Sequence, residues 1–181
     1  MYKKILITGT GRCGTTFLIK IFSFLKLDTG YTKENYHNNI FTNCNSGMES
    51  DFKSKHRYLK NPTFMMIDID KIHTLYGNDV LFIVPIRSFE ESAKSRVSHK
   101  NYAGGLFHAN NFNEQVAFYY NTFSNFLRKI TKNDINTIFI DFDRMVSDKM
   151  YLYKKLENIF IQENVSFESF SKEYDFATNI R

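Results

Sequence analysis

The amino-acid sequence predicts an α/β fold with three layers, α/β/α, in which helices cover both faces of a central parallel sheet. Short apolar stretches of strand length alternate along the chain with longer segments of helical periodicity. One strand candidate, residues 80–86, is apolar throughout, as expected of a strand that is buried on both faces. Ligands of such folds bind at the carboxyl ends of the strands. We therefore expect the functional residues to follow the strands directly.

The elements are expected in the following order. An apolar run at residues 5–7 predicts the first strand, and a second run from Phe17 to Leu27 predicts a helix. Residues 28–56 are rich in Asn, Ser, Thr and Gly and show no clear period. Further strands are expected at residues 57–60, 80–86 and 137–141, and further helices at residues 64–76, 89–100, 111–131 and 148–163.

Length and composition predict one globular domain over residues 1–181. The chain has 181 residues, of which 43% are hydrophobic, enough for a sizeable core. It has no apolar run of about 18 residues and no signal-peptide layout, so we expect a cytoplasmic protein without a membrane span. The net charge of +5 fits an anionic ligand, although a diffuse basic surface has the same charge. Nucleic acid is not indicated as a partner, and the two cysteines show no zinc-binding spacing.

The loop between the first strand and the first helix carries the most informative motif. Gly9 and Gly14 have the G-x-x-x-x-G spacing of a phosphate-binding P-loop, which Thr15 and Thr16 follow. Glycines allow the backbone to wrap around an anion, and the helix N-terminus adds a favourable dipole. Nucleotide kinases need a lysine after the second glycine. Here that position is Thr15, and the cation of the loop is Arg12.

This loop resembles that of the sulfotransferases that use 3′-phosphoadenosine 5′-phosphosulfate (PAPS). The resemblance covers roughly residues 3–100 and implies a P-loop NTPase-like fold in one sulfotransferase-like domain. It also implies that the loop grips the 5′-phosphosulfate group through Gly11, Arg12, Cys13, Gly14, Thr15, Thr16 and Phe17. The alternative is a plain glycine turn between a strand and a buried helix, with a solvated Arg12.

The end of strand 80–86 is similar to a second sulfotransferase segment. Arg87 and Ser95 have the spacing at which the family binds the 3′-phosphate of its cofactor. A strand-end arginine offers a planar fork of donors to a phosphate dianion. The other charged residues of this segment are expected to be solvated on the helix surface as ion pairs: Glu90, Glu91, Lys94 and Arg96.

A third segment, Lys60-Asn61-Pro62, resembles the lysine-x-proline segment of the tyrosylprotein branch of the family. The resemblance implies that Lys60 and Arg12 act on the charge of the leaving group, and that no metal is needed. A base must take the proton of the acceptor. Glu34, which follows the first helix, is the first candidate for this base, with His37 and Glu49 behind it. By itself, Lys60 could equally be an ordinary surface lysine.

The implied activity is transfer of a sulfuryl group from PAPS to a hydroxyl or amine of a small molecule, glycan or peptide, with 3′,5′-ADP as product. Residues 30–57 and 101–113 are expected to shape the acceptor pocket. A P-loop kinase or NTPase would hold magnesium with Asp141, but the loop lysine is missing. A non-catalytic nucleotide-binding domain would leave Lys60 and Glu34 idle. A cysteine phosphatase needs an arginine where Ile19 stands, so that interpretation fails.

Overall fold

The computed structural model describes residues 2–67, 69–99 and 103–180. In this part of the chain, four strands form the central sheet in the order β4-β1-β5-β6. They are β1 (Lys4–Ile7), β4 (Tyr58–Lys60), β5 (Val80–Ile86) and β6 (Thr137–Asp141). All neighbouring pairs of this sheet are parallel. The predicted α/β fold with a central parallel sheet is confirmed.

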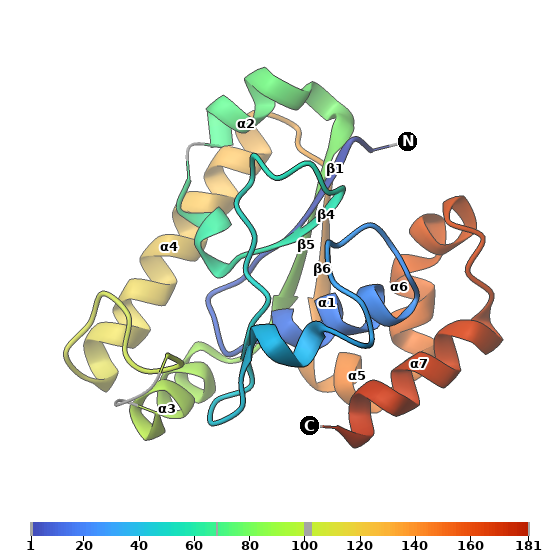
Figure 1. Ribbon diagram of the computed structural model, residues 1–181. Helices are drawn as coiled ribbons and strands as arrows, with labels where there is room; N and C mark the ends of the chain where they lie inside the picture. The colour runs from blue at the N-terminus through green and yellow to red at the C-terminus, as the bar shows by residue number, and fades with distance from the viewer. Residues whose placement is uncertain (1, 68, 100–102, 181) are drawn as a thin grey trace.

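Helices flank both faces of the sheet (Figure 1). One face carries α1 (Thr15–Phe24), α5 (Phe142–Ser147), α6 (Lys149–Gln162) and α7 (Phe167–Asn179), and the other carries α2 (Ile69–Tyr76) and α4 (Phe112–Lys132). The alternation of side chains along a strand explains the two cores. Ile5 and Ile7 of β1 pack into the first core, whereas Leu6 packs into the second.

The helices differ from the sequence prediction in two ways. The helix expected at residues 64–76 is divided into a short 3-10 helix, η2 (Pro62–Met65), and α2. The Asn61 side chain accepts a hydrogen bond from the Thr63 N–H and so begins η2 directly after β4. Two helices were not predicted, α5 and α7. Each begins at a side chain that caps its first turn, Asp141 for α5 and Ser166 for α7.

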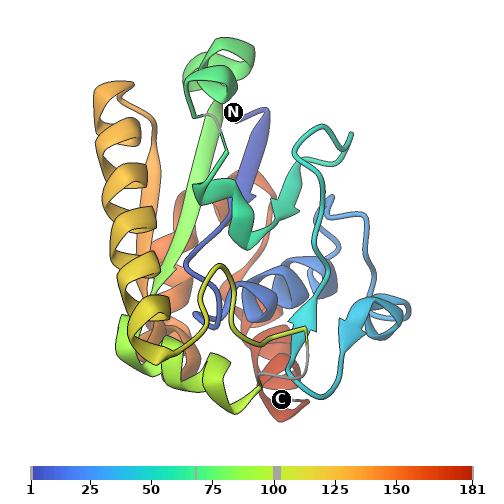
Figure 2. The same cartoon turned by 90° about the vertical axis from the view of Figure 1, so that its left-hand side faces the viewer.

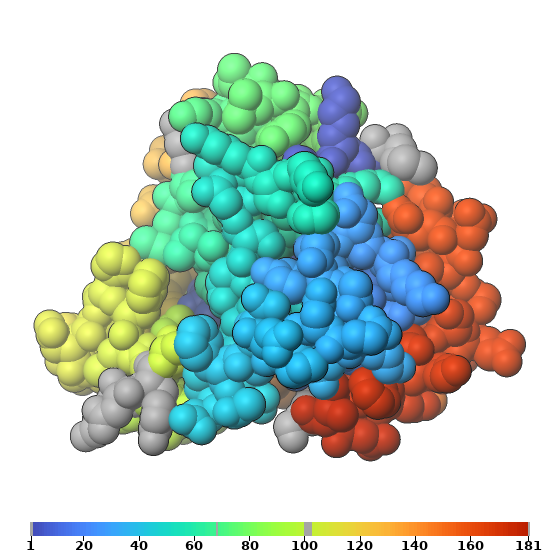
Figure 3. Space-filling model, viewed as in Figure 1, coloured from blue at the N-terminus to red at the C-terminus, as the bar shows by residue number. Residues whose placement is uncertain are grey.

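The segment without a sequence period, residues 28–56, contains the 3-10 helix η1 (Tyr36–Asn39) and a small antiparallel hairpin. The hairpin pairs β2 (Ile40–Phe41) with β3 (Ser46–Gly47), and we call residues 40–49 the hairpin segment. Residues 30–56, coloured light blue to teal, form the middle of the face shown in Figure 3. Strands of two residues are too short to show a period of two, so this region could not be predicted.

The carboxyl ends of the strands point to one end of the molecule (Figure 2). The loop after β1, the helix α3 (Phe89–Ser98) after β5 and the chain that leads into α4 come together there. The arrangement is that expected of a parallel sheet, whose ligand sites lie at this edge. Among the described residues, no helix combines the length and the apolar character that crossing a membrane requires.

Candidate functional site

A cavity of about 380 Å³ opens at the carboxyl edge of the sheet. Its size is that of a small-molecule site. Its walls come from the central sheet and from the segments around its carboxyl edge. They are the loop after β1, the first half of α1, the ends of β4 and β5, the hairpin segment, α3, residues 103–104, α5 and α7. The described lining residues are Gly11, Arg12, Gly14, Thr15, Thr16, Phe17, Lys20, Phe41, Asn45, Ser46, Glu49, Lys60, Pro62, Arg87, Arg96, Ala103, Gly104, Phe142 and Ala177.

The glycine loop wraps one end of this cavity and leads into a buried helix. Gly14 has a φ of +88° and directly precedes α1, in which Thr15 and Thr16 are buried. The hydrogen bonds of the first turn begin with the Phe17 and Leu18 N–H groups, which donate to the Gly14 carbonyl. Because Gly14, Thr15 and Thr16 line the cavity, the N-terminus of α1 faces it. A helix N-terminus favours an anion.

The structure brings Arg12, Arg87 and Ser95 together. The Arg12 guanidinium donates through Nε to Ser95 Oγ over 3.0 Å and through Nη1 to the Cys44 carbonyl. Arg87 Nη1 donates to the Arg12 carbonyl over 3.2 Å. Burial lowers the pKa of Arg12, and the positive charges of Arg96 and Arg87 act in the same direction. Ser95 does not line the cavity itself. Its hydroxyl accepts a hydrogen bond from Arg12, which does.

Arg96 is a residue of this site that sequence reasoning missed. It was expected to be solvated, but it is buried on α3 and lines the cavity. Its Nε donates to Tyr119 Oη and its Nη1 to the Gly105 carbonyl, both over 2.5 Å. A Cβ atom at Gly11 would clash with Arg96 Nη2, so the glycine makes room for the guanidinium. A usable signal was its spacing from Phe89 and Ala93, the apolar residues seven and three positions earlier, which predicts a shared helix face.

The expectation of a solvated surface is confirmed for the three other charged residues that it named, Glu90, Glu91 and Lys94, which are exposed. Glu90, Glu91 and Lys94 lie outside the cavity, and Lys94 pairs with Glu91 over 2.7 Å at the surface. By contrast, three described arginines, Arg12, Arg87 and Arg96, line one cavity. The single carboxylate among the described lining residues, Glu49, is paired with Lys60. This excess of positive charge favours a ligand with several negative charges.

Lys60 lines the cavity and contacts the hairpin segment. Its side chain is 1% exposed, and its ammonium group donates to Glu49 Oε1 over 2.5 Å and to the Gly47 carbonyl over 2.9 Å. The backbone of Lys60 is held in the sheet, paired with Ile7 of β1. Burial lowers the pKa of Lys60, and the charge of the Glu49 carboxylate offsets part of this effect.

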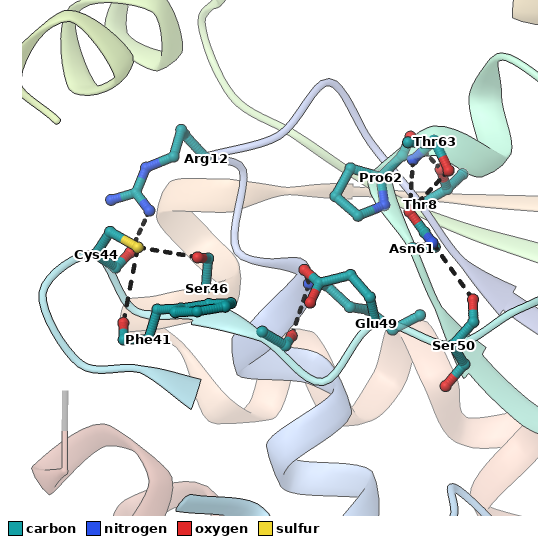
Figure 4. A network of polar contacts seen from close by, with 12 residues as sticks. Thr8, Arg12, Phe41, Cys44, Ser46, Glu49, Ser50, Asn61, Pro62 and Thr63 are labelled. Carbon is teal, nitrogen blue, oxygen red and sulfur yellow. Dashed lines mark hydrogen bonds and ion pairs between the residues drawn. The ribbon is translucent and has the colours of Figure 1, made fainter. Parts of the chain in front are cut away.

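Of the three candidate bases, the structure brings Glu49 to the cavity. Glu49 follows β3, and its side chain, which is 39% exposed, pairs with the buried Lys60. Figure 4 shows the Glu49 side chain between Ser46 of the hairpin segment and the Asn61–Pro62 segment. Glu34 lies just before η1 and His37 lies within it. Both are exposed, and neither is among the residues that line the cavity. A hydrogen bond to Thr32 lowers the pKa of Glu34. The carboxylate that can meet a substrate in this cavity is therefore that of Glu49.

Cys13 lies behind the glycine loop. Its side chain is fully buried against Gly9, where an added Cβ atom would clash with the sulfur. Burial raises the pKa of the Cys13 thiol, which opposes formation of the thiolate. Cys13 is not among the lining residues, so its side chain supports the shape of the loop and does not reach the cavity.

The described residues of the chain contain no group of three or more His, Cys, Asp or Glu side chains that could hold a metal ion. Asp141, at the end of β6, accepts a hydrogen bond from the Arg144 N–H and caps α5. No protein-family model matches the chain, and no curated protein matches it. The function is therefore inferred from the site itself.

Proposed function

We propose that this protein is a PAPS-dependent sulfotransferase with a P-loop NTPase-like fold. It would transfer a sulfuryl group to a hydroxyl or amine of an acceptor. One observation carries the proposal. Three segments far apart in the sequence, each similar to a sulfotransferase motif, meet at one cavity: the glycine loop with Arg12, the strand end at Lys60, and Arg87 with Ser95.

The residues at the arginine-rich end of the cavity fit the two anionic groups of PAPS. The glycine loop and the N-terminus of α1 would hold the 5′-phosphosulfate, because both favour an anion. Arg87 would hold the 3′-phosphate, with Ser95 acting indirectly by fixing the Arg12 guanidinium, and Arg96 adds a third guanidinium to the cavity wall. When bound, PAPS supplies an activated sulfuryl group.

Lys60 and Glu49 are suited to the two charges that develop during transfer. Glu49 would take the proton of the acceptor hydroxyl while the acceptor oxygen forms its bond to sulfur. The bond from sulfur to the phosphate oxygen breaks, and its electron pair leaves with 3′,5′-ADP. The ammonium group of Lys60 and the guanidinium of Arg12 would stabilise the charge that grows on this oxygen.

Glu49 replaces Glu34 as the proposed base because it lines the cavity and contacts Lys60. The competing kinase or NTPase activity is disfavoured by the missing loop lysine and by the role of Asp141 as a helix cap. A nucleotide-binding domain without catalysis would need neither the buried Lys60 nor its pairing with Glu49. Burying an ammonium group is costly, which argues for a use.

Calorimetry with 3′,5′-ADP, 5′-AMP, ATP and GTP tests the nucleotide site. A charge-assisted contact to the 3′-phosphate should make 3′,5′-ADP bind about tenfold or more tightly than 5′-AMP. The substitution Arg87→Met should remove this difference. Turnover of radiolabelled PAPS, without added metal and with a panel of acceptors, then separates an enzyme from a binding domain. Equal affinities for 3′,5′-ADP and 5′-AMP, or a preference for ATP with magnesium, would contradict the proposal.

A further inference from the structure

A second hollow, of about 290 Å³, lies against the hairpin segment. It shares two lining residues with the main cavity, Phe41 and Glu49. The Phe41 ring is 58% exposed, which is unusual for a large apolar side chain beside a cavity. The Tyr31 hydroxyl donates to the Glu49 carbonyl over 3.1 Å and fixes the strip between the two hollows. A ligand in this outer hollow would therefore reach the main cavity past Phe41 and Glu49.

The outer hollow has aromatic and amide groups but little net charge. Its described lining residues are Tyr31, Asn38, Asn39, Ile40, Phe41, Met48 and Glu49. The buried Met48 lies beneath, while Asn38 and Asn39 are exposed. None of these lining residues is a lysine, an arginine or a histidine. The one carboxylate, on Glu49, is already paired with the ammonium group of Lys60.

This lining discriminates between classes of acceptor. An acidic peptide would meet a carboxylate and no cation in the hollow, so like charges would oppose its binding. A cationic acceptor would have to compete with Lys60 for Glu49. A wholly apolar acceptor would make no hydrogen bond with the exposed amides of Asn38 and Asn39 and would shield them from water. A sugar chain satisfies both kinds of group, because its hydroxyls pair with amides and its C–H faces pack on aromatic rings.

We propose that the outer hollow is the acceptor subsite and that the acceptor is a neutral oligosaccharide. The sugar chain lies against Phe41 and the amides of Asn38 and Asn39, and one hydroxyl passes Phe41 to meet the Glu49 carboxylate. The role of this hydroxyl as sulfuryl acceptor rests on the proposed function. The binding of the sugar at the hairpin segment does not.

Saturation-transfer NMR with the full chain tests the binding directly. The probes are cellotetraose, chitotetraose, maltotetraose and N-acetyllactosamine, with an acidic tyrosine peptide and an uncharged serine peptide for comparison. At least one oligosaccharide should bind, and neither peptide should. Asn38→Ala should weaken that binding about fivefold, and Phe41→Ala about tenfold, by loss of a hydrogen bond and of ring contact respectively. Asn43→Ala is the matched control, since Asn43 is exposed in the same hairpin turn and lines neither hollow.

The same samples are titrated with 3′,5′-ADP, whose affinity Asn38→Ala and Asn43→Ala should not change, because neither asparagine lines the main cavity. Binding of 3′,5′-ADP without any oligosaccharide would overturn the acceptor inference and leave the proposed function intact. Binding of an oligosaccharide that Asn38→Ala and Phe41→Ala do not weaken, or binding of the acidic peptide in its place, would also overturn it. Oligosaccharide binding that the two variants weaken, with no affinity for 3′,5′-ADP, would support the subsite and reject the sulfotransferase.

Discussion

The arginine end of the cavity and its hairpin end are held in different ways. At the arginine end, Arg12 lies in the loop between β1 and α1, Arg87 directly follows β5, and Arg96 is on the helix after β5. Their positions are therefore fixed by the central sheet and by helix packing. At the hairpin end, Phe41 and Glu49 belong to a hairpin whose strands have only two residues each. If the proposed function holds, this difference would give a fixed site for the nucleotide beside an adaptable site for the acceptor.

Lys60 lines the cavity and is paired with Glu49 of the hairpin end, so its substitution should have the largest effect on turnover. Lys60→Met keeps most of the side-chain volume and removes the charge of Lys60, which in the proposed reaction would stabilise the leaving oxygen. Turnover should fall about 10²- to 10³-fold, as for loss of one preorganised electrostatic group. The affinity for 3′,5′-ADP, which lacks the sulfuryl group, should change much less. Both quantities are measured by kinetics with labelled PAPS and by calorimetry.

Lys53→Met is the matched control, because Lys53 is exposed and lies outside both hollows. It should change neither turnover nor nucleotide affinity. Equal losses of turnover and of 3′,5′-ADP affinity in Lys60→Met would mean that Lys60 only holds the nucleotide.

Glu49→Gln should have the next largest effect and should act on the hairpin end alone. The change keeps the shape of the side chain and removes its basicity, so turnover should fall at least about tenfold. Glu34→Gln, outside the cavity, should remain within about twofold of the original chain, since it removes no contact of the cavity. The opposite outcome, an inactive Glu34→Gln beside an active Glu49→Gln, would reinstate Glu34 as the base.

Gly47→Ala should have the smallest effect on turnover of these three substitutions. It should also distinguish most clearly between a change at the hairpin end, read as turnover, and a change at the arginine end, read as 3′,5′-ADP affinity. Gly47 has a φ of +128°, and an added Cβ atom would clash with the Asn39 carbonyl across the hairpin. Strain of this kind costs of order 1–3 kcal/mol, so the melting temperature should fall by roughly 3–8 °C. Turnover should fall a few-fold as Glu49 shifts, while 3′,5′-ADP affinity holds.

Gly77→Ala provides the comparison for this substitution. Gly77 also has a positive φ, +53°, but nothing lies within 4 Å of an added Cβ atom. Its cost should be limited to the backbone term of about 1–2 kcal/mol, with turnover unchanged. A loss of 3′,5′-ADP affinity in Gly47→Ala as large as the loss of turnover would show that the two ends are not independent.

The two ends also differ in how well they could be predicted from the sequence. The glycine loop and the pair Arg87 and Ser95 were found because their spacing lies within one strand–loop–helix unit. Arg96 was missed because charges spaced along a helix look solvated until a neighbouring loop covers one of them. Glu49 stood third among the candidate bases because its contact with Lys60 depends on a turn that local sequence does not specify.

Two arginines that contact neighbouring loops, the half-buried Arg12 and the buried Arg96, also act as tethers. Arg12 donates to the carbonyl of Cys44, and Arg96 donates to the carbonyl of Gly105, so each guanidinium ties one loop to the cavity wall. A guanidinium has five N–H donors, and a donor that is hydrogen-bonded to a carbonyl is not available to an incoming anion. The more donors these two arginines use on the loops, the fewer hydrogen bonds they can make to a phosphate group. If an anion binds at these guanidinium groups, it competes for the same N–H donors as the Cys44 and Gly105 carbonyls, so its binding would weaken the attachment of both loops.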